Sequence, residues 1–409
     1  MASKRPRETR NTMPQIKPEV QTFARIKVVG VGGSGKNALN HMVNAKVKGV
    51  EFIAVNTDAQ DLHHSLAQKK IHIGKNLTRG LGTGMNPELG KRAVEETKEE
   101  VQEALKGADM VFITGGMGGG TCTGSAPGIA RTSKEQGALT IAVVTKPFFF
   151  EGQHRMRLAE VGLEELRKEV DAIIIIPNDR LLAVVSKETT AKSAFAICDE
   201  VLKQAVEGIS DLITMPGFIN IDFADIRAIL QNSGSALMGV GNGSGEKRAE
   251  DAAKAAINSP LLDLSIHGAK GVLFSIAGGD DLTMYEIQDA AKIITESIDS
   301  DAKVIFGTIH DDRMQKGEVR VTVVAAGFPD NAIKHSLFPT HGTQQESEEK
   351  EKRGKIFNSI STPKETAKVE IKEVPKVAPV VDDKKLPQID EHDDDWGAVP
   401  AFLRRSKIK

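Results

Sequence analysis

The chain has 409 residues, enough for two or three folded domains with at least one large core. Its 54 basic and 56 acidic residues give a net charge of −2, which argues against a protein that coats nucleic acid and against a polybasic membrane anchor. Two cysteines cannot form a disulfide framework, so we expect a reducing compartment. The apolar runs are short, and no apolar stretch follows the basic start. We therefore expect neither a membrane-spanning helix nor a secretory signal.

Short β-branched runs alternate with helical patterns along the first half of the chain. Five of these runs predict strands, at 26–31, 50–55, 110–114, 138–145 and 171–176. They are apolar almost throughout, which is typical of a parallel sheet with helices on both faces. The sequence therefore predicts an α/β fold with a Rossmann-like parallel sheet.

Helical periodicity extends over a long segment after these strands. Between Thr189 and Ile213 the apolar residues recur three or four apart, which places them along one stripe of a long helix. This stripe consists of Phe195, Cys198, Leu202, Ala205, Ile209 and Leu212. Pro216 and Gly217 end the helix, which we expect to join two domains. The elements expected in the second domain are helices at 224–231 and 247–257 and strands at 271–276, 302–308 and 320–326.

The two ends of the chain differ in composition from its centre. Residues 1–24 are polar and contain three prolines, so we expect a disordered extension. Residues 329–388 are rich in Lys, Glu, Ser, Thr and Pro, which predicts a disordered linker. The segment 389–409 combines an acidic run with Trp396, several apolar residues and two adjacent arginines. A short segment of this kind on a flexible tether is typical of a docking peptide, and a plain disordered terminus is the alternative.

The first glycine-rich segment lies between a predicted strand and a predicted helix. Gly30 to Gly35 fits G-x-G-x-x-G, in which glycines let the backbone approach a phosphate and the helix N-terminus offers free N–H groups. A dinucleotide site needs an acid near the end of the second strand, and Asp58 lies there. The same residues nearly match a P-loop. However, Asn37 follows Lys36 in the place of the hydroxyl residue that binds magnesium, which counts against a Walker-type NTPase.

Two further glycine-rich segments indicate a phosphate site. Residues 115–124 contain six glycines and two threonines, directly after a predicted strand. Backbone N–H groups of such a loop can surround phosphate oxygens, and threonine hydroxyls add hydrogen bonds. Residues 80–84 carry three more glycines. Loops at the carboxyl ends of parallel strands meet at one edge of the sheet, where nucleotides bind.

These segments resemble a known family. Gly118-Gly119-Gly120-Thr121-x-Thr123-Gly124 resembles the signature loop of the tubulin/FtsZ superfamily, and its companions resemble the bacterial FtsZ branch. These companion motifs lie, in the order of the family, at 32–38, 56–60, 80–87, 147–155, 176–179 and 220–225. The resemblance covers about 25–328 and resumes at 400–404. It implies a GTP-binding domain at 25–188, a central helix at 189–214 and a C-terminal α/β domain at 215–328.

The resemblance implies that GTP binds in the glycine loops and is hydrolysed to GDP. The nucleotide-binding residues that it implies are Gly32, Gly33, Ser34, Gly35, Lys36, Asn37, Asn56, Gly82, Thr83, Gly84, Gly118, Gly119, Gly120, Thr121, Cys122, Thr123, Gly124, Glu151, Arg155, Asn178 and Asp199. An aspartate at position 199 suits guanine, because one carboxylate can accept two N–H groups of that base. Without the resemblance, Asp199 belongs to a solvated face of the long helix. We expect Mg²⁺ with the nucleotide, and K⁺ is a further candidate.

The resemblance also implies an active site shared between subunits. Subunits of the family stack head to tail, so Asn220, Asp222 and Asp225 of one subunit would position the attacking water near the γ-phosphate of the next. Taken alone, the two acids could cap the helix that follows them. A head-to-tail contact that does not close into a ring propagates as a polymer, so we expect a homopolymer.

Two positions depart from the family pattern. Cys122 stands where the signature loop usually has glycine, and a side chain there costs roughly 1 kcal/mol if the position needs a positive φ. Its place beside a helix N-terminus also predicts a lowered thiol pKa. Met85 replaces a residue that is usually small. We expect these departures to affect the rate of hydrolysis more than the fold.

The C-terminal peptide resembles the segment through which the family binds membrane-tethering and regulatory division proteins. Its expected contact residues are Val399, Pro400, Phe402, Leu403 and Arg404. The acids Asp393–Asp395 argue against direct attachment to anionic lipid. The resemblance thus implies a cytoplasmic GTPase that forms filaments at the mid-cell division ring. A Rossmann dehydrogenase that uses Asp58 and a nucleotide-binding scaffold without turnover stay open as alternatives.

Overall fold

A computed structural model describes residues 24–184, 189–215, 217–259, 266–311 and 314–328. The predictions for the linker at 329–388 and for the docking peptide at 389–409 fall outside the described residues. So does the predicted N-terminal extension, apart from its last residue, Ala24. Within the described ranges, no helix combines the length and the apolar character needed to span a membrane.

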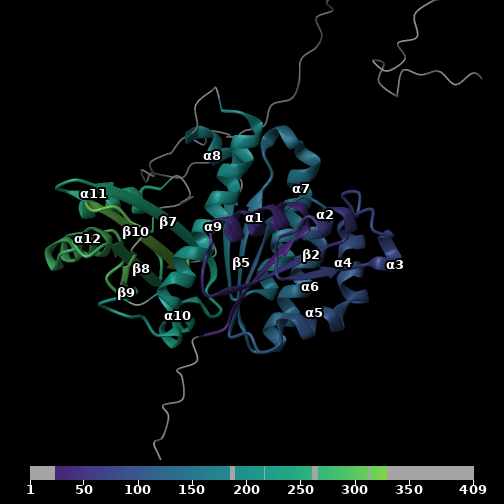
Figure 1. The fold of residues 1–409 in the computed structure, drawn as a ribbon, viewed down its shortest axis with the longest axis horizontal. Coiled ribbons are helices and arrows are strands. Elements are labelled where there is room, and N and C mark those ends of the chain that lie inside the picture. Colours follow the sequence, from purple (N-terminus) through teal and green to yellow (C-terminus); the bar gives the residue numbers. More distant parts are fainter. Residues whose placement is uncertain (1–23, 185–188, 216, 260–265, 312–313, 329–409) are drawn as a thin grey trace, which may run out of the picture. The chain divides into compact units, whose positions relative to one another are not determined.

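The first part of the chain alternates strands and helices (Figure 1). All five strands expected there are present, and a short additional strand, β3, lies beside β2. The elements are β1 (Ile26–Val31), α1 (Gly32–Asn44), β2 (Val50–Asn56), α2 (Ala59–His63), β3 (Lys69–His72), α3 (Lys75–Thr78), α4 (Pro87–Glu96), α5 (Lys98–Leu105), β4 (Met110–Gly116), α6 (Thr121–Glu135), β5 (Leu139–Lys146), the 3-10 helix η1 (Phe149–Glu151), α7 (Gln153–Glu169) and β6 (Ala172–Pro177).

The second part contains the long helix and a further group of strands. Its elements are α8 (Asn178–Val184), α9 (Ala191–Thr214), α10 (Phe223–Leu230), β7 (Gly234–Ser244), α11 (Arg248–Ile257), β8 (Gly271–Gly278), α12 (Met284–Glu296), β9 (Lys303–His310) and β10 (Glu318–Ala326). The sequence did not predict β7 or α12.

Ten strands form one mixed sheet in the order β3-β2-β1-β4-β5-β6-β7-β10-β8-β9. The strands from β3 to β7 pair in parallel, and the register of β1 places Ile26 opposite both Val50 of β2 and Met110 of β4. β10 runs antiparallel to β7 and β8, and β9 pairs in parallel with β8. The predicted α/β fold with a parallel sheet is confirmed.

Helix α9 is the long helix expected at 189–213. Thr190 caps its N-terminus, because its side-chain oxygen accepts a hydrogen bond from the Ser193 N–H at 3.2 Å. Most of the predicted apolar stripe is buried, whereas Phe195 is 46% exposed. Phe195 lies in the first turns of the helix, where α9 borders a cavity rather than the core.

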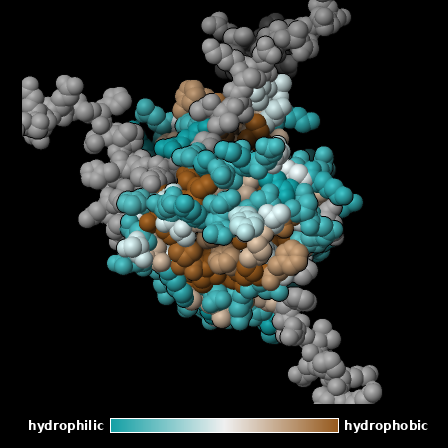
Figure 2. Space-filling model, turned by 90° about the vertical axis from the view of Figure 1, so that its left-hand side faces the viewer, coloured by the Kyte–Doolittle hydropathy of each residue, from teal (hydrophilic) through white to brown (hydrophobic). Residues whose placement is uncertain are grey.

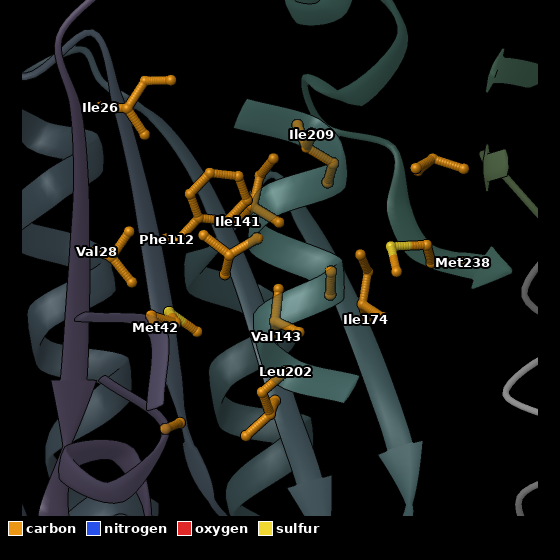
Figure 3. Close-up of a cluster of buried hydrophobic side chains, with 14 of the residues drawn as sticks. Ile26, Val28, Met42, Phe112, Ile141, Val143, Ile174, Leu202, Ile209 and Met238 are labelled. Carbon is orange, nitrogen blue, oxygen red and sulfur yellow. The ribbon is translucent and has the colours of Figure 1, made fainter. Parts of the chain in front are cut away.

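The stripe of α9 packs into the largest apolar cluster of the described chain (Figure 3). Strands of both parts of the sheet contribute to this cluster, so α9 packs against residues of both parts. The side chains labelled in Figure 3 are Ile26, Val28, Met42, Phe112, Ile141, Val143, Ile174, Leu202, Ile209 and Met238. Truncating a fully buried leucine or isoleucine of this kind to alanine costs about 2–5 kcal/mol. The core thus fixes α9, and α9 in turn fixes the residues at its two ends.

Strand β9 forms one edge of the sheet. Its alternate residues Val304 and Phe306 are partly exposed, and the Phe306 ring stacks on Phe274 of β8 with ring centroids 5.5 Å apart. Figure 2 views the molecule from the side on which α11 and α12 lie in Figure 1, and it shows an apolar area on that face bordered by polar residues. The C-terminal part of the β9 edge is covered, because the Thr308 N–H donates to the Ile219 carbonyl.

Candidate nucleotide-binding site

Loops that follow parallel strands border a cavity of about 440 Å³. These loops come from β1, β4, β5 and β6, and α9 supplies one wall. The predicted site residues that line the cavity are Gly32, Gly33, Ser34, Asn37, Thr83, Gly119, Gly120, Thr121, Cys122, Glu151, Arg155, Asn178 and Asp199. The glycine loops predicted to converge therefore do so, at the edge of the sheet where nucleotides bind in α/β folds.

The loop between β4 and α6 is held by hydroxyl hydrogen bonds. The Gly118 N–H donates to the Thr123 hydroxyl at 2.9 Å, and Gly118 itself has φ +91°. The hydroxyl oxygen of Thr121 lies 2.7 Å from that of Thr57 and 3.3 Å from that of Thr83. Thr121 begins α6, so the N-terminal N–H groups of that helix face the cavity side of the loop. Such a helix start attracts anions.

The loop between β1 and α1 needs glycines for close approach. Gly32 has φ +72°, which favours glycine. A Cβ at Gly35 would lie 2.6 Å from the Thr114 carbonyl oxygen, so α1 can pack against β4 only without a side chain there. Gly33 and Ser34 lie in the first turn of α1 and line the cavity, so a second helix N-terminus faces the same space.

An ion pair lies in the wall of the cavity that η1 and α7 form. Arg155 of α7 pairs with Glu151 of η1, and the Glu151 carboxylate also accepts the Phe148 N–H at 3.0 Å. Two buried polar atoms of this wall, Arg155 Nε and Asn178 Oδ1, have no hydrogen-bond partner within the described chain. A donor and an acceptor left without partners in a cavity fit a polar ligand such as a ribose or a phosphate.

Asp199 is an acidic group whose ionisation the cavity shifts strongly. It lies on α9 and lines the cavity beside Cys198. Burial raises the pKa of Asp199 to about 6, and the positive charges of His41 and Lys36 offset part of this effect. The carboxylate is therefore about half ionised near pH 6, and above that pH its ionised form presents two acceptor oxygens to the cavity.

The prediction of a lowered thiol pKa for Cys122 is wrong. Burial raises the pKa of this thiol to about 12, because no water solvates the thiolate. Cys122 lies in the first turn of α6 and has no positive φ, so the backbone strain considered for this position is absent as well. Its Sγ packs 3.9 Å from Met117 Sδ. Met85 does adopt the left-handed region, with φ +63°.

Other predicted residues lie around the cavity without lining it. These are Gly35, Lys36, Asn56, Gly82, Gly84, Gly118, Thr123 and Gly124. Most of them shape the loops, as Gly118 and Thr123 do through their hydrogen bond. Lys36 and Asn56 instead direct their side chains to Asp61, at 2.6 Å and 2.8 Å.

Eight residues that the sequence did not assign to the site complete the lining. They are Val31, Met85, Gly116, Met117, Thr145, Pro147, Phe195 and Cys198. Phe195 and Cys198 share one face of α9 with Asp199, so the helical spacing of this segment could have suggested them. The Phe195 ring meets Phe148 edge to face, with centroids 5.3 Å apart, and extends the apolar wall.

The three predicted catalytic residues lie elsewhere. Asn220 accepts the Gly217 N–H at 2.8 Å, Asp222 caps α10 through the Ala224 N–H at 3.2 Å, and Asp225 is exposed in the first turn of α10. None of them lines the cavity. They follow the C-terminal end of α9, whereas Asp199 lies near its beginning, and a helix rises ~1.5 Å per residue. A distance on the order of 20 Å therefore separates them from the cavity of their own subunit.

Comparison with known proteins identifies the two halves of the described chain. A model of the Tubulin/FtsZ family GTPase domain matches residues 25–186, and a model of the FtsZ family C-terminal domain matches residues 234–329. The chain belongs to the tubulin/FtsZ family. It is accordingly a GTPase of this family, and it binds guanine nucleotide.

Solved structures agree with this family. An FtsZ dimer from M. jannaschii is 46% identical, with a TM-score of 0.72, over 75% of this chain and 89% of that chain. A point mutant of M. jannaschii FtsZ gives the same identity and TM-score, over 75% and 92%. CetZ2 from Haloferax volcanii is 22% identical with a TM-score of 0.65, over 76% and 96%, which shows a shared fold.

The dehydrogenase alternative does not fit this family or this geometry. Asp58 would have to bind a ribose, but its side chain caps α2 by accepting the Asp61 N–H at 2.9 Å. Asp58 does not line the cavity. The first glycine loop lines the cavity through Gly32, Gly33 and Ser34, whereas Asp58 does not, so the pair of features needed for a dinucleotide site is not brought together.

Proposed function

We propose that this GTPase polymerises head to tail and hydrolyses GTP at the contact between subunits, as the filament of a division ring. The observation that carries the proposal is the separation of the two parts of the site. The cavity holds phosphate-binding loops, while the exposed Asp222 and Asp225 lie about a helix length away. A neighbouring copy can bring the two together, because the donor loop and the acceptor cavity lie on different parts of one chain.

Exposed apolar residues lie beside the cavity and in the loop that carries Asn220, and they support a subunit contact at these two surfaces. Leu81 in the loop before Thr83 is 85% exposed, and Phe149 and Phe150 of η1 are 74% and 58% exposed, all near residues that line the cavity. Phe218, in the loop that carries Asn220, is 74% exposed. Large apolar side chains this exposed are typical of surfaces that become buried on association. The M. jannaschii relative described as an FtsZ dimer is consistent with self-association.

The chemistry assigned to the chain's own groups is mainly positioning. In this proposal the α1 and α6 N-termini and the signature loop bind the phosphates, and ionised Asp199 accepts two N–H groups of guanine. Arg155 and Asn178 offer the unpartnered atoms Nε and Oδ1 to the ribose and phosphate. The loop acids of the next copy orient the attacking water. Phosphoryl transfer needs little more than such positioning and charge stabilisation.

Metal ions enter this proposal with the nucleotide. Within the described residues, no group of three or more His, Cys, Asp or Glu side chains could hold a metal ion. Mg²⁺ fits as a partner of the phosphate oxygens, because this hard cation prefers oxygen ligands, and K⁺ fits as a further ion near them. The chain's own residues contribute hydrogen bonds and dipoles to the same phosphates.

We include in the same proposal a role in the division ring and the binding of partner proteins. Membrane-tethering and regulatory division proteins would bind the peptide with Val399, Pro400, Phe402, Leu403 and Arg404, which lies outside the described residues. We place the protein in the cytoplasm at the mid-cell ring on the strength of the resemblance of this peptide to the family's docking segment.

GTP turnover measured against protein concentration tests the proposal. We would record phosphate release and light scattering in the same samples, with magnesium and potassium present. A threshold concentration at which both signals rise together is expected for a shared site. Asp225→Asn should abolish turnover but keep GDP binding, because the cavity is intact. Asp251→Asn, an exposed acid in the first turn of α11, is the matched control and should behave as the wild type.

Turnover that is proportional to concentration, without scattering, would show a self-contained nucleotidase. Binding of GTP without any turnover at all concentrations would favour the scaffold alternative. Both results contradict the proposal.

A further inference from the structure

Lys36 and Asp61 form an ion pair directly behind the first glycine loop. The Lys36 Nζ lies 2.6 Å from Asp61 Oδ1, and the two side chains are 12% and 29% exposed. A Cβ built on Gly33, which lines the cavity, would lie 3.5 Å from Asp61 Oδ2. The pair therefore touches the outer side of the loop whose inner side faces the nucleotide cavity.

Asp61 also holds the amide of Asn56. The Asn56 Nδ2 donates to Asp61 Oδ2 at 2.8 Å, while the Asn56 Oδ1 accepts the Asp58 N–H at 3.3 Å. Asn56 is 3% exposed at the end of β2, so its amide orientation is fixed by these two bonds. One carboxylate thus connects a lysine of α1 with an asparagine of β2.

We propose that Asp61 is a positioning residue for the nucleotide, because it sets where the Lys36 ammonium lies behind the first glycine loop and thereby how strongly Lys36 acts on Asp199. This inference rests on the proposed use of Asp199 to bind guanine. It adds that the Lys36–Asp61 ion pair, which does not line the cavity, adjusts how strongly Asp199 binds guanine.

The charges around Asp199 come from four elements, α1, η1, α7 and α9 itself. From α1, Lys36 and His41 favour its ionised form. His41 Nε2 lies 2.8 Å from Glu200, whose negative charge lies next to Asp199 in sequence. From η1 and α7, Glu151 and Arg155 line the same cavity and pair with each other. Neither Lys36 nor its counter-charge Asp61 lines the cavity, so either can be substituted without removing a side chain that lines it.

Substitutions at the two ends of the ion pair should act in opposite directions. Lys36→Gln removes a positive charge, so Asp199 holds its proton to a higher pH. Asp61→Asn leaves Lys36 without its counter-charge, so its field on Asp199 is compensated less and Asp199 loses its proton at a lower pH. The amide introduced by Asp61→Asn can still accept the Asn56 Nδ2 hydrogen bond through its own Oδ1. Loss of local structure would instead weaken binding in both variants alike.

The experiment measures the affinity of the full chain for fluorescently labelled GDP between pH 5 and 8. The variants are Lys36→Gln, Asp61→Asn and Asp61→Ala, with Lys75→Gln as the matched control. Lys75 pairs with Glu100 at 3.0 Å on the surface, so its substitution also removes one lysine from an ion pair. We expect the pH midpoint of binding to rise by about half a unit in Lys36→Gln and to fall by a similar amount in Asp61→Asn. Lys75→Gln should leave it unchanged.

The affinity for GDP at pH 8 distinguishes the effect of charge on Asp199 from the effect of the Asn56 orientation. There Asp199 is ionised in every variant, so Asp61→Asn should bind GDP within about threefold of the wild type. Asp61→Ala removes the acceptor for Asn56 and should bind about tenfold more weakly.

Equal midpoints in all variants, or shifts of both ion-pair variants in the same direction, would overturn the inference. Failure of the underlying proposal has a different signature. In that case Asp199→Asn binds GDP with the same pH profile as the wild type, whatever happens at Lys36 and Asp61.

Discussion

The hydroxyl oxygens of Thr57 and Thr121 lie 2.7 Å apart, although 64 positions separate the two residues in the chain. Thr57 follows β2 and Thr121 begins α6, and the Thr121 hydroxyl also lies 3.3 Å from that of Thr83. The loop after β2 is therefore joined at one threonine to two loops that border the nucleotide cavity, those of Thr83 and Thr121. This joint fixes the start of α6, which lines the cavity at Thr121 and Cys122.

We expect Thr57→Val to lower both stability and nucleotide affinity. The valine is similar in shape, but it removes one buried hydrogen bond, which costs about 1 kcal/mol of unfolding free energy. Because the start of α6 loses one of its supports, affinity for GDP should fall several-fold. Urea denaturation and GDP titration measure the two effects.

Thr132→Val in the same helix provides the control. Its hydroxyl donates to the Gly128 carbonyl at 2.9 Å, within α6 and away from the nucleotide cavity. It should lose a similar amount of stability while keeping its GDP affinity. Equal losses of affinity in both variants would show that the threonine joint has no special role.

Acidification should weaken nucleotide binding through Asp199. The pKa of Asp199 is raised to about 6, so the carboxylate becomes protonated as pH falls from 7 to 5. Protonated Asp199 accepts fewer hydrogen bonds from guanine, and affinity should fall about tenfold per pH unit below its pKa. Titration of labelled GDP from pH 8 to 5 measures this, and a flat profile would contradict it.

The same pKa shift predicts that Asp199→Asn stabilises the nucleotide-free protein. A folded-state pKa raised above the unfolded value of 3.8 means that the folded state binds the proton more tightly. The stability linked to this proton is complete below the unfolded pKa and is lost as pH rises through about 6. Asparagine avoids that loss. The melting temperature of the variant should therefore exceed that of the wild type at pH 7.5, and the difference should vanish below about pH 3.

The sequence predicts most strands but not β3 and β7, and each omission has a physical cause. β3 (Lys69–His72) is a four-residue edge strand that begins with two lysines, so it lacks an apolar run. β7 contains glycines at 234, 239, 241 and 243, which favour a loop prediction. The reason for them lies in packing, because a Cβ at Gly243 would come within 2.8 Å of the Arg248 carbonyl carbon in α11.

The sequence predicts those parts of the cavity that are formed by local sequence motifs. Glycine loops are local patterns, and thirteen of the twenty-one predicted nucleotide residues line the cavity. The direction of the Lys36 side chain depends instead on Asp61, 25 positions away. Likewise, Cys122 is shielded by the surrounding fold, so its high pKa could not be read from its place at a helix start.

Met85 is expected to carry backbone strain at the cavity. It lines the cavity with φ +63°, a region that costs an L-residue roughly 1 kcal/mol. Met85→Gly should relieve this strain, whereas Met85→Ala keeps the Cβ and therefore the strain. The glycine variant should be more stable than the alanine variant by about 0.5–1 kcal/mol in urea denaturation, after the greater flexibility of unfolded glycine is taken into account. Equal stability of the two variants would show that the backbone here is not strained.

Mixing two inactive variants tests whether the active site is shared. Asp225→Asn keeps an intact cavity but lacks a functional loop, while Asp199→Asn keeps the loop but lacks a functional cavity. Each variant alone should show little GTP turnover. In an equal mixture, about one contact in four pairs an intact cavity with an intact loop, so turnover should recover to about a quarter of the wild-type rate. If both functions acted within one chain, no mixture would recover activity, because every chain would carry one defect.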